Sequence, residues 1–184
     1  MRPYALSLAL LLGLVLVAPQ VLADKVFGWV ERATIEPWGV AVKAKLDSGA
    51  LTSSLDAREI EIFEKEDEEW VRFRLKLEDS QSGEIFSETL ELPLYRDLRV
   101  RGAGGRDERP VVLMKVCMDN TVYEQQFSLR DRGEMHYPLL LGRRTISQLG
   151  LVDVRKTFLN VPDCGEQAPF EAYEPDGLEE GHDG

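Results

Sequence analysis

Apolar and polar residues alternate along most of the chain with a period of two. In segment 40–46 every second residue is apolar, and segment 71–77 repeats the pattern with Arg and Lys at the intervening positions. Such alternation is typical of β-strands that pack one face on a core and expose the other to water. Further strands are predicted at residues 25–33, 111–118, 121–129, 138–141 and 152–159.

Turn-forming residues separate these strands and delimit one short helix. Asp119–Asn120 predicts a β-hairpin turn between 111–118 and 121–129, because both residues tolerate left-handed backbone conformations. Arg143–Leu149 is the one plausible helix, and Gly150 follows it as a stop signal. The sequence therefore predicts an all-β fold, a closed or nearly closed barrel with one short helix.

Two loops stand out by their composition. Asp79–Gly83 is predicted to be a turn, and Arg99–Pro110 contains Gly102, Gly104 and Gly105 among charged residues. The second loop is predicted to be a mobile, solvent-exposed hairpin tip and is a candidate flap. No Gly-Lys-Ser/Thr follows these glycines, so they do not form a nucleotide-binding P-loop.

The first 23 residues differ from the rest of the chain. Arg2 gives a positive start, residues 5–18 form an almost unbroken apolar run, and Val21–Ala23 fits a small-residue cleavage rule before Asp24. The run is too short for a membrane span, so we predict a secretory signal peptide at 1–23. The mature protein is then expected to be periplasmic or secreted, with no stable membrane insertion after cleavage. An uncleaved anchor is the alternative.

Residues 163–184 are acidic, with eight Asp and Glu residues and no Lys or Arg. Such a stretch buries too little apolar area to offset its ordering entropy, so we predict a disordered acidic tail after a folded domain at 24–162. The tail accounts for most of the net charge of −11 and the pI of about 4.7. An acidic balance disfavours nucleic acid and anionic membranes as partners.

Asp47-Ser48-Gly49-Ala50 places a carboxylate where an apolar strand ends. Gly49 allows a tight backbone turn beside Asp47, and the Ser48 hydroxyl is able to hydrogen-bond the neighbouring main chain. This arrangement suits a carboxylate that must be fixed yet accessible. Asp-Ser-Gly is also a common turn sequence, so the tripeptide alone does not identify a site.

Further motifs accompany Asp-Ser-Gly, in the order found in one protein family. They are Gly28–Glu31, Ala44–Ala50 with Thr52–Leu55, Trp70–Phe73, Arg109–Val112, Arg130–Arg132, Leu139–Arg143, Val152-Asp153 and Leu159. Through them, residues 26–162 resemble the retropepsin-like aspartic protease family that is also labelled ATP-dependent zinc protease.

The resemblance implies a pepsin-like half-barrel in which Asp47 is catalytic and Ser48, Gly49 and Ala50 form the active-site loop. It also implies that Leu140, Leu141 and Gly142 pack beneath that loop. Ser48 stands where the family more often has Thr, which retains the hydroxyl. The ATP and zinc of the label find no support in the residues, because the chain has no HExxH or paired CxxC motif. We therefore expect no metal and no cofactor.

The aspartic protease mechanism needs two carboxylates that share one proton. The chain has one Asp-Ser-Gly and no duplicated half, so two copies of Asp47 must meet across the two-fold axis of a homodimer. The expected function is an aspartic endopeptidase acting on a peptide or protein substrate. The alternative is a non-catalytic module that binds a peptide or a partner protein in the same groove.

Other titratable residues have less specific contexts. Asp131 is either a second carboxylate near the site or a surface turn residue paired with Arg. Asp153 is expected to cap or pair with Arg143 or Arg144, and His136 is expected to be a structural or surface residue.

Cys117 and Cys164 allow two interpretations in an oxidising compartment. One is a disulfide that pins the start of the tail to a core strand. The other is a buried Cys117 with a free Cys164 in the tail.

Overall fold

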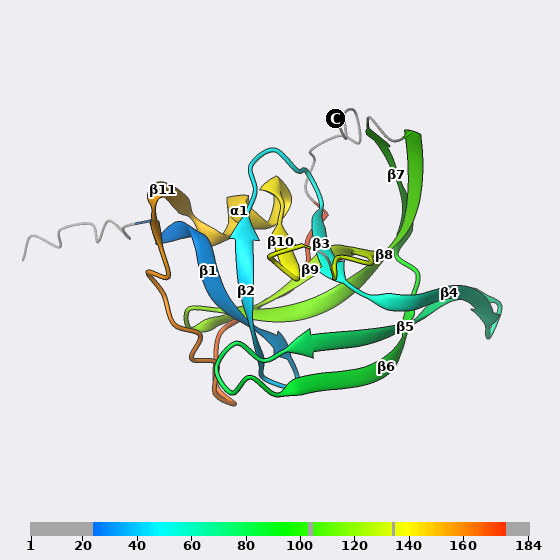
Figure 1. The fold of residues 1–184 in the computed structure, drawn as a ribbon, viewed down its shortest axis with the longest axis horizontal. Helices are drawn as coiled ribbons and strands as arrows, with labels where there is room; N and C mark the ends of the chain where they lie inside the picture. Colours follow the sequence, from blue (N-terminus) through cyan, green and yellow to red (C-terminus); the bar gives the residue numbers. More distant parts are fainter. Residues whose placement is uncertain (1–23, 103–104, 134, 176–184) are drawn as a thin grey trace, which may run out of the picture.

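A computed structural model describes residues 24–102, 105–133 and 135–175 (Figure 1). Its strands and helix are β1 (Val26–Glu36), β2 (Val40–Leu46), β3 (Ser53–Asp56), β4 (Arg58–Lys65), β5 (Glu68–Glu78), β6 (Ile85–Pro93), β7 (Arg96–Gly102), β8 (Gly105–Met118), β9 (Thr121–Arg130), β10 (Leu139–Leu141), α1 (Arg143–Leu149), β11 (Leu151–Thr157) and β12 (Phe170–Glu171). The predicted signal peptide at 1–23 lies outside the described residues. No helix in the described part of the chain is long and apolar enough to cross a membrane.

Six strands close a barrel in the order β1-β2-β10-β3-β9-β8, with β8 returning to pair with β1. Most pairings are antiparallel, but β10 runs parallel to β2, and β3 runs parallel to β9. The all-β barrel with one short helix is therefore confirmed. The helix has the predicted bounds, Arg143–Leu149, and Gly150 ends it with a positive φ of 137°.

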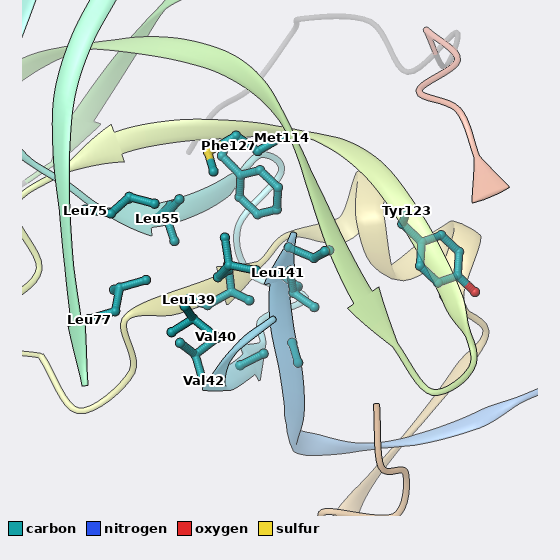
Figure 2. Close-up of a cluster of buried hydrophobic side chains, with 14 of the residues drawn as sticks. Val40, Val42, Leu55, Leu75, Leu77, Met114, Tyr123, Phe127, Leu139 and Leu141 are labelled. Atoms are coloured by element: carbon teal, nitrogen blue, oxygen red, sulfur yellow. The ribbon is translucent and has the colours of Figure 1, made fainter. Parts of the chain in front are cut away.

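A second sheet, β4-β5-β6, covers one side of the barrel and shares its core. The alternating apolar side chains of β5 are at most 1% exposed, whereas the Arg and Lys residues between them lie on its outer face. Figure 2 shows Leu75 and Leu77 of β5 pointing toward Leu55 and Leu139 of the barrel strands. The period of two along β5 thus records which face meets the core.

The carboxylate of Glu31 in β1 is buried and holds the chain that follows β11. Its oxygens accept hydrogen bonds from the backbone N–H groups of Gly28 (2.6 Å), Leu159 (3.0 Å) and Asn160 (3.1 Å). The predicted strand at 152–159 ends early, at Thr157, because Phe158 has a φ of 54°. Charged acceptors of this kind fix a segment more firmly than neutral ones.

The predicted disorder from residue 163 onward is wrong for residues 163–175. Cys117 and Cys164 form a disulfide, Phe170 of β12 pairs with Val122 of β9, and the Tyr173 ring packs edge-on against Tyr95. The cross-link removes much of the entropy that would otherwise favour an unattached chain, so a few further contacts suffice to order it. Residues 176–184 lie outside the described residues.

Candidate active site

Asp47 follows directly after β2, at the point where β2 and β10 run side by side. Its backbone N–H donates to the Leu141 carbonyl at 2.8 Å, which continues the parallel pairing by one residue. The chain then crosses to β3 in the loop that leaves the arrowhead of β2 (Figure 1). Within the loop, Ala50 N–H donates to the Asp47 carbonyl at 3.2 Å. Two neighbouring strands thus fix the backbone of the aspartate.

The Asp47 carboxylate is held at both oxygens. Oδ1 accepts from Gly49 N–H at 3.0 Å, and Oδ2 accepts from Lys45 Nζ at 2.9 Å. The hydrogen bond from Lys45, assisted by that from Gly49 and opposed by partial burial, lowers the pKa of Asp47 below its ordinary value. The side chain remains 27% exposed, so the charged group is fixed yet accessible to a ligand.

The Leu140-Leu141-Gly142 segment supports the loop from below, and a side chain at Gly142 would not fit. A Cβ there would lie 2.6 Å from the Leu51 carbonyl oxygen. Arg143 N–H donates to the Ala50 carbonyl at 2.9 Å, and the Arg143 guanidinium donates to the Ser48 carbonyl at 2.9 Å. The start of α1 therefore holds the active-site loop through main-chain atoms.

Buried hydroxyl groups tie the loop to α1 and β9. Ser53 Oγ accepts from Gly142 N–H at 3.0 Å and lies 2.7 Å from Thr145 Oγ1, which in turn donates to Gln125 Oε1 at 3.2 Å. Thr52 Oγ1 accepts from Arg96 at 3.0 Å. These hydroxyls satisfy neighbouring polar groups. The Ser48 hydroxyl, expected to bond the neighbouring main chain, makes no hydrogen bond to any described residue. A fully bonded polar network of this kind rigidifies its surroundings.

The other candidate carboxylates have structural partners of their own. Asp131 lies at the surface and pairs with Arg58 at 2.7 Å, which matches the surface-turn alternative. Asp153 pairs with Arg155 at 3.0 Å, which lowers its pKa to about 2. The expected pairing of Asp153 with Arg143 or Arg144 is wrong, because Arg155 lies two residues along the same strand and shares its face. His136 is exposed at the surface.

The β7–β8 hairpin lies beside the active-site loop, and its tip at 103–104 is outside the described residues. Leu98 and Val100 of β7 line a cavity of about 120 Å³ together with Ala50 and Leu51 of the loop. Strands β7 and β8 thus place Leu98 and Val100 beside the active-site loop, and the flap role of segment 99–110 stays a prediction.

No three His, Cys, Asp or Glu side chains among residues 24–102, 105–133 and 135–175 gather closely enough to hold an ion. The described residues therefore do not fit the zinc named in the family label.

Comparison with known proteins finds a matching family model and a solved structure with a similar fold. A family model described as "RimB-like: Retropepsin-like aspartic endopeptidase RimB" matches residues 26–163. In the crystal structure of a protein of unknown function (DUF785) from Legionella pneumophila, the matching chain is 30% identical, with a TM-score of 0.62. The match covers 74% of this chain and 98% of the Legionella chain.

Curated relatives are longer proteins that bear a different name. Residues of this chain are 31% identical over 139 positions to a "Probable alpha-L-glutamate ligase" of Shewanella pealeana, covering 75% of this chain and 29% of that protein. A protein of the same name from Shewanella halifaxensis is 33% identical over 119 positions, covering 64% and 26%. The chain thus spans less than a third of the length of these relatives.

Proposed function

Because the chain belongs to the RimB-like family of retropepsin-like aspartic endopeptidases, we propose that it hydrolyses peptide bonds with a water activated by two Asp47 carboxylates, one from each subunit of a homodimer. The observation that carries the proposal is the geometry of the Asp47 carboxylate. The hydrogen bond from Gly49 N–H fixes the carboxylate, and its side chain is still exposed enough to meet a ligand. Preorganised, accessible carboxylates of this kind are suited to general acid–base catalysis.

The two carboxylates divide the chemistry between them. One Asp47 is ionised and accepts a proton from the water that attacks the scissile carbonyl carbon. The other is kept protonated by the like charge beside it and donates to the carbonyl oxygen. The C–N bond of the tetrahedral intermediate then breaks, and the leaving nitrogen takes the proton that the first Asp47 accepted from the water; the carbonyl reforms and returns its proton to the second Asp47.

The proposed substrates are peptides that contain glutamate. The curated relatives are named for the ligation of glutamate, and this chain corresponds to a segment of less than a third of each. A hydrolase segment within a glutamate ligase would be expected to cleave the kind of bond that the ligase forms, a peptide bond to glutamate. We place the mature protein in the periplasm or outside the cell, because residues 1–23 have the pattern of a signal peptide.

The dimer makes activity dependent on concentration. We expect the specific activity of the mature chain to fall on dilution, in step with dissociation measured by sedimentation, and a statine-like transition-state mimic to inhibit it. Cleavage of a diverse peptide library from pH 3 to 8 is the assay. A monomer whose specific activity does not change on dilution would rule out the shared Asp47 pair.

The hydrogen bond from Lys45 is the largest cause of the lowered pKa of Asp47. The substitution Lys45→Met removes this hydrogen bond, so the pKa of Asp47 should rise. The acidic limb of the profile of kcat/KM against pH should then move to higher pH. Lys43→Met is the matched control, because Lys43 lies two residues earlier on the same face of β2 and forms no ion pair with any described residue. An unmoved acidic limb in Lys45→Met would contradict the role given to Lys45.

A second candidate is a module that binds a peptide or partner protein without cleaving it. The observation in its favour is the ion pair between Lys45 and Asp47, which stabilises the ionised carboxylate and so opposes the shared proton that catalysis needs. Such a module would bind its peptide equally well after Asp47→Asn and would cleave nothing at any pH.

A further inference from the structure

A small cavity beside the active-site loop combines an apolar wall with buried polar groups. Leu98 and Val100 of β7 and Leu140 of β10 form the apolar part. The polar part consists of hydroxyl and guanidinium groups from strands β3, β8 and β9 and from the loops before β3 and after β9: Thr52, Ser54, Arg109, Ser128 and Arg132. Its volume of about 120 Å³ is well below that of a pocket for a whole small-molecule ligand, and is closer to the space of one side chain.

Arg132 is the buried cation of this cavity. The residue is 8% exposed, and its guanidinium donates to the Tyr137 carbonyl from Nε (3.3 Å) and to Ser54 Oγ from Nη1 (3.4 Å). Both contacts are long, and Nη2 donates to no described residue. No carboxylate among the described residues lies within ion-pair distance of this guanidinium. A buried charge without a paired counter-charge is costly unless a ligand supplies one.

Two cations and two carboxylates act on the guanidinium of Arg132. Burial lowers the pKa of its guanidinium, and repulsion from Arg130 and Arg109 acts in the same direction, while Asp56 and Asp47 oppose it. Arginine still remains protonated under such shifts. The Asp56 carboxylate accepts a hydrogen bond from the backbone N–H of Arg132 at 2.6 Å and makes no ion pair with its guanidinium. The guanidinium is therefore available to an anion that enters from the cavity.

We propose that this cavity is the specificity pocket of the enzyme, in which Arg132 binds the carboxylate of a glutamate side chain of the substrate. The proposal rests on the proposed function for the identity of the substrate and adds the residue that selects it. Leu98, Val100 and Leu140 contact the two methylene groups of the glutamate, and Arg132 receives the carboxylate at the polar end. Ala50 and Leu51 line the same cavity, so a side chain held there lies next to the Asp47 loop.

The experiment compares otherwise identical octapeptides with Glu, Gln or Leu placed in turn at each position. At one position near the cleaved bond we expect kcat/KM for Glu to exceed that for Gln by about 10- to 100-fold, the range for hydrogen bonds to a charged group. Equal rates for Glu and Gln at every position would overturn the pocket while leaving the peptidase intact. This comparison uses the unmodified protein, so it does not depend on a variant that folds.

Variants then assign the preference to one residue. Arg132→Gln should bring the ratio of kcat/KM for the Glu and Gln peptides to about one, and Arg132→Lys should retain part of the preference for Glu. Arg130→Gln is the matched control, since it removes a neighbouring positive charge outside the cavity lining. A Glu preference that survives Arg132→Gln, or one that Arg130→Gln removes instead, would overturn the assignment.

Binding separates failure of the pocket from failure of the peptidase. If no peptide is cleaved, the same Glu and Gln peptides are titrated calorimetrically into the parent and into Asp47→Asn. Tighter binding of the Glu peptide that requires Arg132 would support the pocket and refute the endopeptidase. Indifference to Glu and Gln in the binding titration would overturn the pocket.

Discussion

Replacing Asp47 by asparagine is expected to abolish peptide cleavage and to leave the fold intact. The change removes the group that both accepts the proton of the attacking water and donates to the carbonyl oxygen, so kcat/KM should fall by about 10²- to 10⁴-fold or more. Asparagine keeps an oxygen for Gly49 N–H and fits the same space. The free energy of unfolding of the variant should therefore stay within about 1 kcal/mol of that of the parent.

Cleavage by the parent and by Asp47→Asn, measured in parallel on the same peptides, is the deciding observation. Ser48→Thr is a matched control within the loop, because it restores the commoner hydroxyl residue and touches no hydrogen bond of the carboxylate. It should cleave at close to the parental rate. Cleavage by Asp47→Asn at the parental rate would show that another group, or a contaminating enzyme, performs the chemistry.

The sequence predicts those elements of the fold in which the alternation of apolar and polar residues matches the buried and exposed faces. The apolar residues of β5 and the helix Arg143–Leu149 were found where the sequence placed them. The strand β3 (Ser53–Asp56) was missed because all four of its residues are buried, although three are polar. Hydroxyl and carboxylate groups satisfied by distant partners, such as Arg132 N–H on Asp56, give no alternation to detect.

The candidate site was only partly predictable for a similar reason. The Asp47 loop and its support at Leu140–Gly142 follow from a local motif and a resemblance. The Lys45–Asp47 pair was missed, although residues two apart on a strand share a face and the spacing could have suggested it. Arg132 lies far from Asp47 in sequence, and no local pattern indicates that its guanidinium lines a cavity with Ala50. Such contacts depend on closure of the barrel.

Residues 163–175 show how a covalent bond can override composition. Their charge and proline content predict disorder, whereas the disulfide between Cys117 and Cys164 ties the start of the segment to β8. Both alternatives for the two cysteines were open because the distance between their Cα atoms depends on tertiary structure. In the folded chain that distance is 6.1 Å, within reach of a disulfide. The error was thus one of long-range geometry rather than of local propensity.

Removing the disulfide between Cys117 and Cys164 is expected to lower the stability of the folded protein substantially. Opening a cross-link between residues separated by 47 positions returns entropy to the unfolded chain worth about 4 kcal/mol in the chain-entropy account. The variant Cys164→Ala is the milder way to test it, because Cys164 is half-buried whereas Cys117 lies fully within the barrel. The free energy of unfolding, measured with urea, should fall by that amount, and amide protons of 164–175 should exchange faster.

Reducing agent provides the matched control. The reduced parent should unfold at the same urea concentration as Cys164→Ala, and Cys164→Ala itself should not respond to the reagent. Catalysis should be retained well below the new midpoint, because the Asp47 loop is held by Leu141, Gly142 and Arg143 rather than by the C-terminal segment. If reduction leaves the unfolding midpoint of the parent unchanged, then β12 and Tyr173 hold 163–175 in place by packing alone, and the cross-link is not what orders the segment.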